Sequence, residues 1–146
     1  IADDEVDIFN YSSDDSKTGN FTDIGMGYTF AGDTPVSLYY AIIIQGVDKH
    51  IDDSSGELER SYTNYIEVSA PVWHGKNGET VNAFVGGAFS PVHKRNFYSD
   101  NANINNVGFT FSKKINLLNT SFPVSATAMW NPALNHGALQ VAVELF

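Results

Sequence analysis

The chain contains no cysteine, which excludes disulfide bonds and thiol chemistry. It also lacks a long apolar run, because the longest extends only from about Leu38 to Ile44. A transmembrane helix needs ~20 predominantly apolar residues. No stretch repeats its apolar residues with the helical period either. These absences argue against a helical membrane protein and against a disulfide-stabilised scaffold.

Basic residues are scarce. The 146 residues include 8 Lys and Arg against 17 Asp and Glu, for a net charge of -9. This balance argues against nucleic acid as a partner, since phosphate binding needs clustered basic side chains. The acidic residues gather in segments whose composition predicts solvated loops: Asp3–Glu5, Asp14–Asp15, Asp48–Asp53 and Glu57–Glu59.

What the sequence does contain is alternation with a period of two. In the tail, Phe122–Asn131 and Leu139–Leu145 each place an apolar residue at every second position. Successive side chains of a strand point to opposite faces, so each segment has one apolar face and one small or polar face. The same pattern along the chain predicts eight strands: Asp4–Tyr11, Phe21–Phe30, Val36–Gln45, Ser61–Trp73, Thr80–Phe89, Ile104–Leu117, Phe122–Asn131 and Leu139–Leu145.

The connections alternate in length. Those at 31–35, 74–79 and 117–121 are short, whereas those at 46–60 and 91–103 are long. Outer-membrane barrels alternate in this way, because short periplasmic turns and longer external loops lie at opposite ends of antiparallel strands. The sequence therefore predicts an all-β, antiparallel, up-and-down transmembrane β-barrel with about eight strands in one domain, residues 1–146.

In each predicted strand, one set of alternate residues is mostly apolar and the other mostly polar, and we call them the apolar and the polar phase. The polar phase would face the barrel interior if the apolar phase faced lipid. In a narrow barrel these side chains would fill the interior, and in a wider one they would line a cation-preferring channel. The candidates are Asp23, Tyr39, Gln45, Tyr65, Glu67, Asn82 and Glu144.

Aromatic residues occur near the predicted strand ends, where amphipathic rings favour the two interfaces of a bilayer. Ordinary strand-end aromatics of a soluble core are the alternative reading. The candidates are Tyr28, Phe30, Tyr62, Trp73, Phe89, Phe122, Trp130 and Phe146.

No catalytic or metal-binding motif is recognisable. His50, His74, His93 and His136 fall in predicted loops or turns, without the spacing of a zinc site or a nucleophile motif. The segment DKHIDDSSGELE is rich in oxygen ligands but lacks the spacing of a standard calcium loop. We therefore expect no enzyme, no cofactor and no metal, and solvent-exposed histidines.

Three stretches and the closing strand carry a family resemblance. GMGYTF (25–30), SYTNYIEVSAP (61–71), NVGFTFSKKINLLNTSFPVSATAMWNP (106–132) and the terminal Phe146 resemble the TorF-type porin family of Gram-negative outer membranes. The resemblance implies a membrane β-barrel. Because family members are longer, it also implies that this chain is the C-terminal portion of one. The chain departs from the pattern at Phe146, which is one residue out of phase with the apolar set of the last strand.

Three functions follow from these patterns. The first is a porin of the bacterial outer membrane, surrounded by lipid, that lets small polar solutes diffuse passively. The second is a non-conducting structural barrel that binds other envelope proteins through its external loops. The third is a soluble, lipocalin-like ligand-binding barrel with its apolar face inward.

Overall fold

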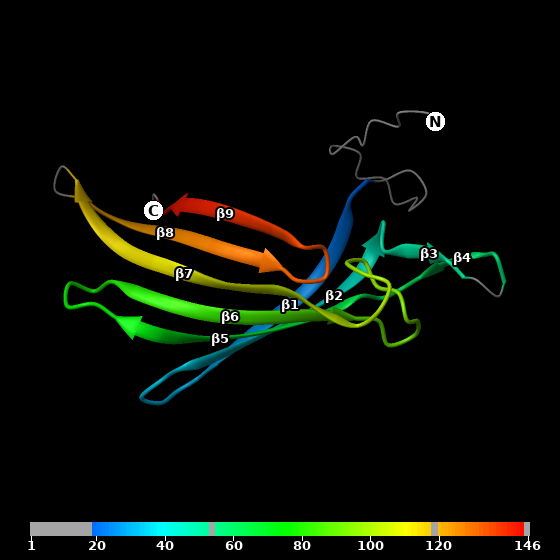
Figure 1. Ribbon diagram of the computed structural model, residues 1–146, viewed down its shortest axis with the longest axis horizontal. Helices are drawn as coiled ribbons and strands as arrows, with labels where there is room; N and C mark the ends of the chain where they lie inside the picture. The colour runs from blue at the N-terminus through cyan, green and yellow to red at the C-terminus, as the bar shows by residue number, and fades with distance from the viewer. Residues whose placement is uncertain (1–18, 53–54, 118–119, 145–146) are drawn as a thin grey trace. The chain divides into compact units, whose positions relative to one another are not determined.

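The computed structural model describes residues 19–52, 55–117 and 120–144, and it contains strands and no helix in these ranges (Figure 1). The predicted all-β, antiparallel class is thereby confirmed. The strands are β1 (Phe21–Phe30), β2 (Val36–Gly46), β3 (Lys49–Ile51), β4 (Leu58–Arg60), β5 (Asn64–His74), β6 (Thr80–Phe89), β7 (Asn103–Leu117), β8 (Thr120–Asn131) and β9 (His136–Val143).

Seven of these strands form one sheet in the order β1-β2-β5-β6-β7-β8-β9. Neighbours in the sheet follow one another along the chain, except where β3 and β4 intervene and pair with each other in a separate two-stranded sheet. Sequential neighbours of this kind need only local connections. β1 and β9 are the edge strands of the described sheet.

Most predicted strands agree closely with those observed, but β8 begins two residues before the predicted start at Phe122 and β9 begins three residues before the predicted start at Leu139. β1 and β6 have the predicted ends, and β2 and β7 differ from the prediction by one residue. The long connection at 46–60 was predicted as a loop, and that prediction is wrong in part, because β3 and β4 lie within it. Each is only three residues long, too short for a two-residue period to be recognised. The predicted strand Asp4–Tyr11 lies outside the described residues.

The chain divides into two compact units. Among the described residues, unit 1 comprises those within 19–26, 40–65 and 88–103, and unit 2 comprises those within 27–39, 66–87 and 104–144. Within unit 2, β8 pairs antiparallel with both β7 and β9.

The register across β7, β8 and β9 keeps the two kinds of side chain apart. Phe109 lies opposite Ala128, and Ala128 lies opposite Leu139, so the apolar phases share one face. Thr110 lies opposite Thr127, with 2.9 Å between the two hydroxyl oxygens. A shift of one residue would place every side chain on the wrong face, so the alternation fixes the register.

Phe84 interrupts the apolar alternation of β6, and the structure shows why. A Cβ added at Gly108 would lie 2.6 Å from Cζ of Phe84 and 2.2 Å from the carbonyl oxygen of Ala128. The aromatic ring therefore covers the glycine on the polar phase of the sheet. An aromatic ring over a strand glycine compensates for the side chain that the glycine lacks.

Unit 1 is organised around a buried carboxylate. Asp48 is 1% exposed and accepts hydrogen bonds from the Thr63 amide at 2.7 Å and from the Thr63 hydroxyl at 2.6 Å. The Ser61 amide donates to the Asp48 carbonyl oxygen at 3.0 Å, and the Phe97 amide donates to the Thr63 hydroxyl at 2.7 Å. One buried side chain thus joins the connection after β2 to the chain before β5 and, through Thr63, to the connection after β6.

This network also explains where β5 begins. The sequence predicted a strand from Ser61, but β5 starts at Asn64. Ser61 and Thr63 are buried and bonded to Asp48, while Tyr62 between them has a φ of 47°. A positive φ is unusual for a bulky residue, and here hydrogen bonds on both sides hold it. The local network overrides the strand propensity of these residues.

We predict that Asp48→Ala destabilises the protein by about 1–3 kcal/mol, because it leaves the buried Thr63 amide and hydroxyl without their acceptor. Urea unfolding of the purified protein measures the change. Asp33→Ala, in the exposed turn between β1 and β2, is the matched control and should lie within about 0.5 kcal/mol of wild type. Equal stability of the two variants would contradict the anchoring role of Asp48.

Candidate functional site

The apolar phase of the sheet is exposed. On β9, Leu139, Val141 and Val143 are 75%, 66% and 52% exposed, and Phe109 on β7 is 56% exposed. Among the described residues, the buried apolar side chains are Ala41, Ile43 and Ala88. Scattered exposed apolar residues are ordinary on a protein surface. A contiguous apolar patch on one face instead marks a surface that contacts a protein, a ligand or a membrane.

The polar phase in unit 2 lines a cavity of about 400 Å³. Glu67 on β5 and Asn82 on β6, both predicted to face inward, lie on its wall together with Thr29, Ser37 and Thr110. The Thr29 and Ser37 hydroxyls are 2.8 Å apart, and the Asn106 side-chain amide donates to Glu67 Oε2 at 3.0 Å. The wall therefore combines hydroxyls, amides and one carboxylate with apolar groups, among them Pro71 and Phe84.

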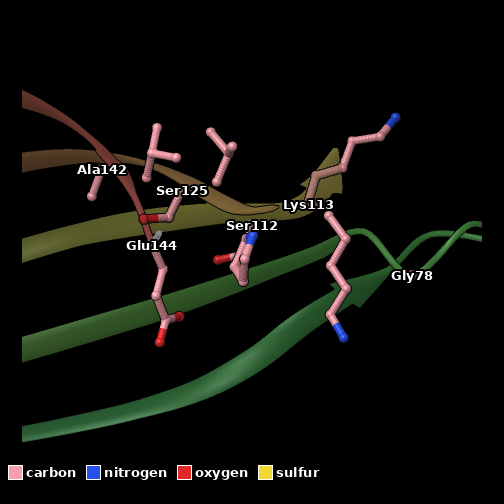
Figure 2. A pocket seen from close by; sticks show the side chains of 10 residues that line it. Gly78, Ser112, Lys113, Ser125, Ala142 and Glu144 are labelled. Carbon is pink, nitrogen blue, oxygen red and sulfur yellow. The ribbon is translucent and has the colours of Figure 1, made fainter. Parts of the chain in front are cut away.

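A second cavity of unit 2, of about 560 Å³, lies over β7, β8 and β9 (Figure 2). Ser112, Ser125 and Ala142 line it from neighbouring strands, and Glu144 lies just beyond the end of β9. The Glu144 amide donates to the Pro123 carbonyl oxygen at 2.9 Å, which extends the β8–β9 pairing by one step. The structure thus places a carboxylate beside small polar side chains of the same phase.

The remaining residues predicted to face inward are dispersed. Asp23 is exposed on β1, Gln45 is half-buried on β2, and the Tyr65 ring lies 6.4 Å from that of Tyr98. These residues belong to unit 1, whereas Tyr39 belongs to unit 2 and packs over Gly27. On the walls of the two cavities of unit 2 described above, none of these four residues lies beside Glu67, Asn82 or Glu144.

The candidate interface aromatics are mostly exposed. The Tyr28 and Phe30 rings pack edge to face at 4.9 Å, and both side chains are at least half exposed. Trp73, Trp130 and Tyr62 are 50%, 46% and 44% exposed. Phe89 and Phe122 are half-buried, and Phe146 lies outside the described residues.

The histidines depart from the prediction that all four lie in loops or turns. His50 lies in β3, His74 ends β5 and His136 begins β9, so for these three residues the prediction is wrong. His93 lies in the connection after β6, and its ring centroid is 4.4 Å from that of His50. The ligand atoms of His50, Asp52 and His93 lie within 4.8 Å of one another. Because His50 and His93 are 43 positions apart in the sequence, no sequence motif indicates this cluster.

Comparison with known proteins found no matching family model, no matching curated protein and no matching solved structure. In the part of the chain that the structure describes, no helix is long and apolar enough to cross a membrane.

The turn between β5 and β6 holds an ionised carboxylate. Hydrogen bonding from its own backbone amide, followed by the Lys113 ammonium at 3.1 Å, lowers the pKa of Glu79 from 4.5 to about 2. The Asn77 amide donates to the same carboxylate at 3.0 Å. Because the folded-state pKa is lowered, the carboxylate stabilises the protein fully above pH 4.5, and this stabilisation is lost as the pH falls toward 2.

We predict that Lys113→Met raises the pKa of Glu79 but leaves it below 4.5, since the backbone hydrogen bonds remain. Carbon-13 NMR titration of the glutamate side chains measures this value. Lys114→Met is the control, because Lys114 belongs to the opposite phase of β7 and should leave the titration unchanged. A wild-type Glu79 that titrates near 4.5 would contradict the assignment.

Proposed function

We propose that this chain is part of an integral outer-membrane β-barrel of the TorF-type porin kind, through which small polar solutes diffuse passively. The observation that carries the proposal is the two-sided sheet. One phase exposes large apolar side chains such as Leu139 and Val141, while the other gathers hydroxyls, amides and carboxylates. Lipid against the apolar face and water against the polar face would give each face an environment of matching polarity.

The free energy of the apolar face favours lipid as its neighbour. Removing apolar surface from water contributes about 25 cal/mol per Å². A face that runs along whole strands, from Leu139 to Val143 on β9 and across Phe109 on β7, is too extensive to leave in water without aggregation. Antiparallel strands can enter lipid because neighbouring strands satisfy their backbone groups.

The proposal requires partners for both edge strands. β1 and β9 end the described sheet, and lipid cannot solvate unpaired backbone amides and carbonyls. In the membrane-embedded form both edges must therefore be paired, either with each other or with further strands.

The polar phase supports a cation preference. Among the described residues, Glu67 lies on the wall of a cavity that no Lys or Arg lines, and carboxylates that line a pore favour cations. Glu144 shares the other cavity wall with Lys114 and with Lys113, which is paired with Glu79. The preference therefore rests mainly on Glu67. Small neighbours such as Ser125 and Ala142 leave room for solvent beside Glu144. We therefore propose a water-filled interior that passes small cations and neutral solutes more readily than anions.

A second candidate is a barrel that anchors other envelope proteins and does not conduct. The hydrogen bonds between Thr29 and Ser37, between Asn106 and Glu67, and between Thr110 and Thr127 favour it. Polar side chains that satisfy one another can fill a narrow barrel and close it to solutes. The width of the complete barrel decides between the two candidates.

Planar-bilayer recording on the folded protein tests the proposal, with folding first verified by an electrophoretic shift on boiling. We predict steady single-channel conductance with a cation preference, which Glu67→Gln and Glu144→Gln each lower. Glu57→Gln is the control, because Glu57 is exposed in the β3–β4 connection and should leave selectivity unchanged. A folded sample without conductance would contradict the porin and favour the anchor.

A further inference from the structure

We propose that His50, Asp52 and His93 bind a divalent transition-metal ion such as Zn²⁺. Two imidazoles and a carboxylate are the ligands that Zn²⁺ takes in open sites, where a fourth position remains for water or a further ligand. The proposal rests on unit 1 alone and does not depend on whether the sheet spans a membrane.

The local fold places two of the three ligands on one face. His50 lies in β3, and Asp52 follows the last residue of that strand. The Asp52 amide donates to the Glu57 carbonyl oxygen at 2.9 Å, which continues the β3–β4 pairing by one step. Residues two apart in such a pairing leave the β3–β4 ribbon on the same side. β3 pairs antiparallel with β4, and Glu59 lies directly opposite His50 in the register. The carboxylate of Glu59 therefore belongs to the same face, and His93 approaches that face from the connection after β6.

The separations suit a small ion. The ligand atoms of the three residues lie within 4.8 Å of one another. Zinc–ligand bonds of about 2.0–2.1 Å in a tetrahedral site bring ligand atoms to roughly 3.3 Å from one another. The ligand atoms therefore have to approach one another by up to about 1.5 Å when an ion binds. The three side chains are half-buried on the wall of a cavity of about 340 Å³, which gives an ion a path of entry.

Each imidazole is oriented by a second hydrogen-bonding group. Nδ1 of His50 lies 3.0 Å from the Ser61 hydroxyl, and Nε2 of His93 lies 3.1 Å from Glu59 Oε2. A metal-binding histidine characteristically donates its other ring N–H to such a partner, which fixes both the tautomer and the ring orientation. These contacts leave Nε2 of His50 and Nδ1 of His93 as the ligand atoms.

Both rings depend on the same buried residue. Ser61 is 2% exposed, and its amide donates to the Asp48 carbonyl oxygen at 3.0 Å. The Ser90 hydroxyl donates to the Ser61 carbonyl oxygen and accepts from the His93 amide at 3.0 Å. The buried network of Asp48 thus positions the ligands before an ion binds, which lowers the cost of ordering them.

The charges near the cluster permit a cation. Lys94 and Arg95 lie on the cavity wall, and Asp100 forms an ion pair with Arg95 at 3.2 Å. The charges of Arg95 and Asp100 cancel. Asp52 and Glu59 then carry two negative charges, and Lys94 carries one positive charge. With neutral imidazoles, the surroundings carry a net charge of -1, and a divalent ion would be attracted.

Calorimetric titration of the folded, chelator-treated full chain with Zn²⁺ tests the proposal. We expect one ion per chain, and His50→Gln, His93→Gln and Asp52→Asn should each weaken binding by at least about tenfold. Glu59→Gln should weaken binding by about 10–100-fold through the orientation of His93. His74→Gln and His136→Gln are the matched controls and should bind as wild type does. Millimolar Mg²⁺ should not compete, because it prefers oxygen ligands.

A second measurement needs no variant. Zn²⁺ should protect His50 and His93 of the wild-type protein from carbethoxylation, with His74 and His136 modified at an unchanged rate, as followed by mass spectrometry. Absence of stoichiometric binding, binding that survives His50→Gln, or equal protection of all four histidines would each overturn the proposal. The last two outcomes would assign the ion to another place on the protein. Because none of these readouts involves conductance, the outcome is independent of the proposed pore.

Discussion

The separation of most apolar and polar side chains onto two faces of one sheet is the constraint on which the structure depends. Thr110 against Thr127 and Ala128 against Leu139 show that the register carries the separation from strand to strand. Only small or branched apolar residues such as Ala41, Ile43 and Ala88 are buried in the described residues. A core of this size cannot supply the hydrophobic free energy of an ordinary soluble domain. Under the proposed function, the exposed apolar face gains its stabilisation from the surrounding lipid.

The long connections are stabilised by different interactions from those of the sheet. In the connections of unit 1, buried polar groups fix the chain, and Asp48 with Thr63 is the central pair. A buried carboxylate is tolerated because amide and hydroxyl donors satisfy both oxygens. This arrangement gives long connections a defined shape without an apolar core. It also explains how two histidines 43 positions apart come to share one side of a short ribbon.

Much of the fold could be predicted from the sequence, because a period of two over ten residues is a strong signal. β1 and β6 have the predicted ends for that reason. The failures have physical causes. β3 and β4 are too short to show a period, and the hydrogen bonds of Asp48 shift the start of β5 from Ser61 to Asn64. Phe84 broke the pattern because its ring covers Gly108 on the next strand, a contact that the sequence does not reveal.

Of the candidate sites, one agrees with the sequence prediction and another could not be predicted. Glu67 and Asn82 share a cavity wall, as neighbours in the polar phase of adjacent strands should. The cluster of His50, Asp52 and His93 could not be predicted, because its ligands come from two connections whose approach depends on Ser61 and Ser90. The one available hint was His50 and Asp52 at alternate positions, and a pair of this kind becomes informative only when the segment is known to be a strand.

The most direct test of the account is the environment of alternate side chains along β8, which pairs on both sides. The chain has no cysteine, so single cysteines introduced at 124, 126 and 128 or at 125 and 127 can each carry one spin label. In reconstituted bilayers, the account predicts that labels at 124, 126 and 128 collide with lipid-soluble oxygen. Those at 125 and 127 should collide with a water-soluble nickel complex instead. Equal access of both sets to the nickel complex would contradict the lipid-facing assignment of the apolar face.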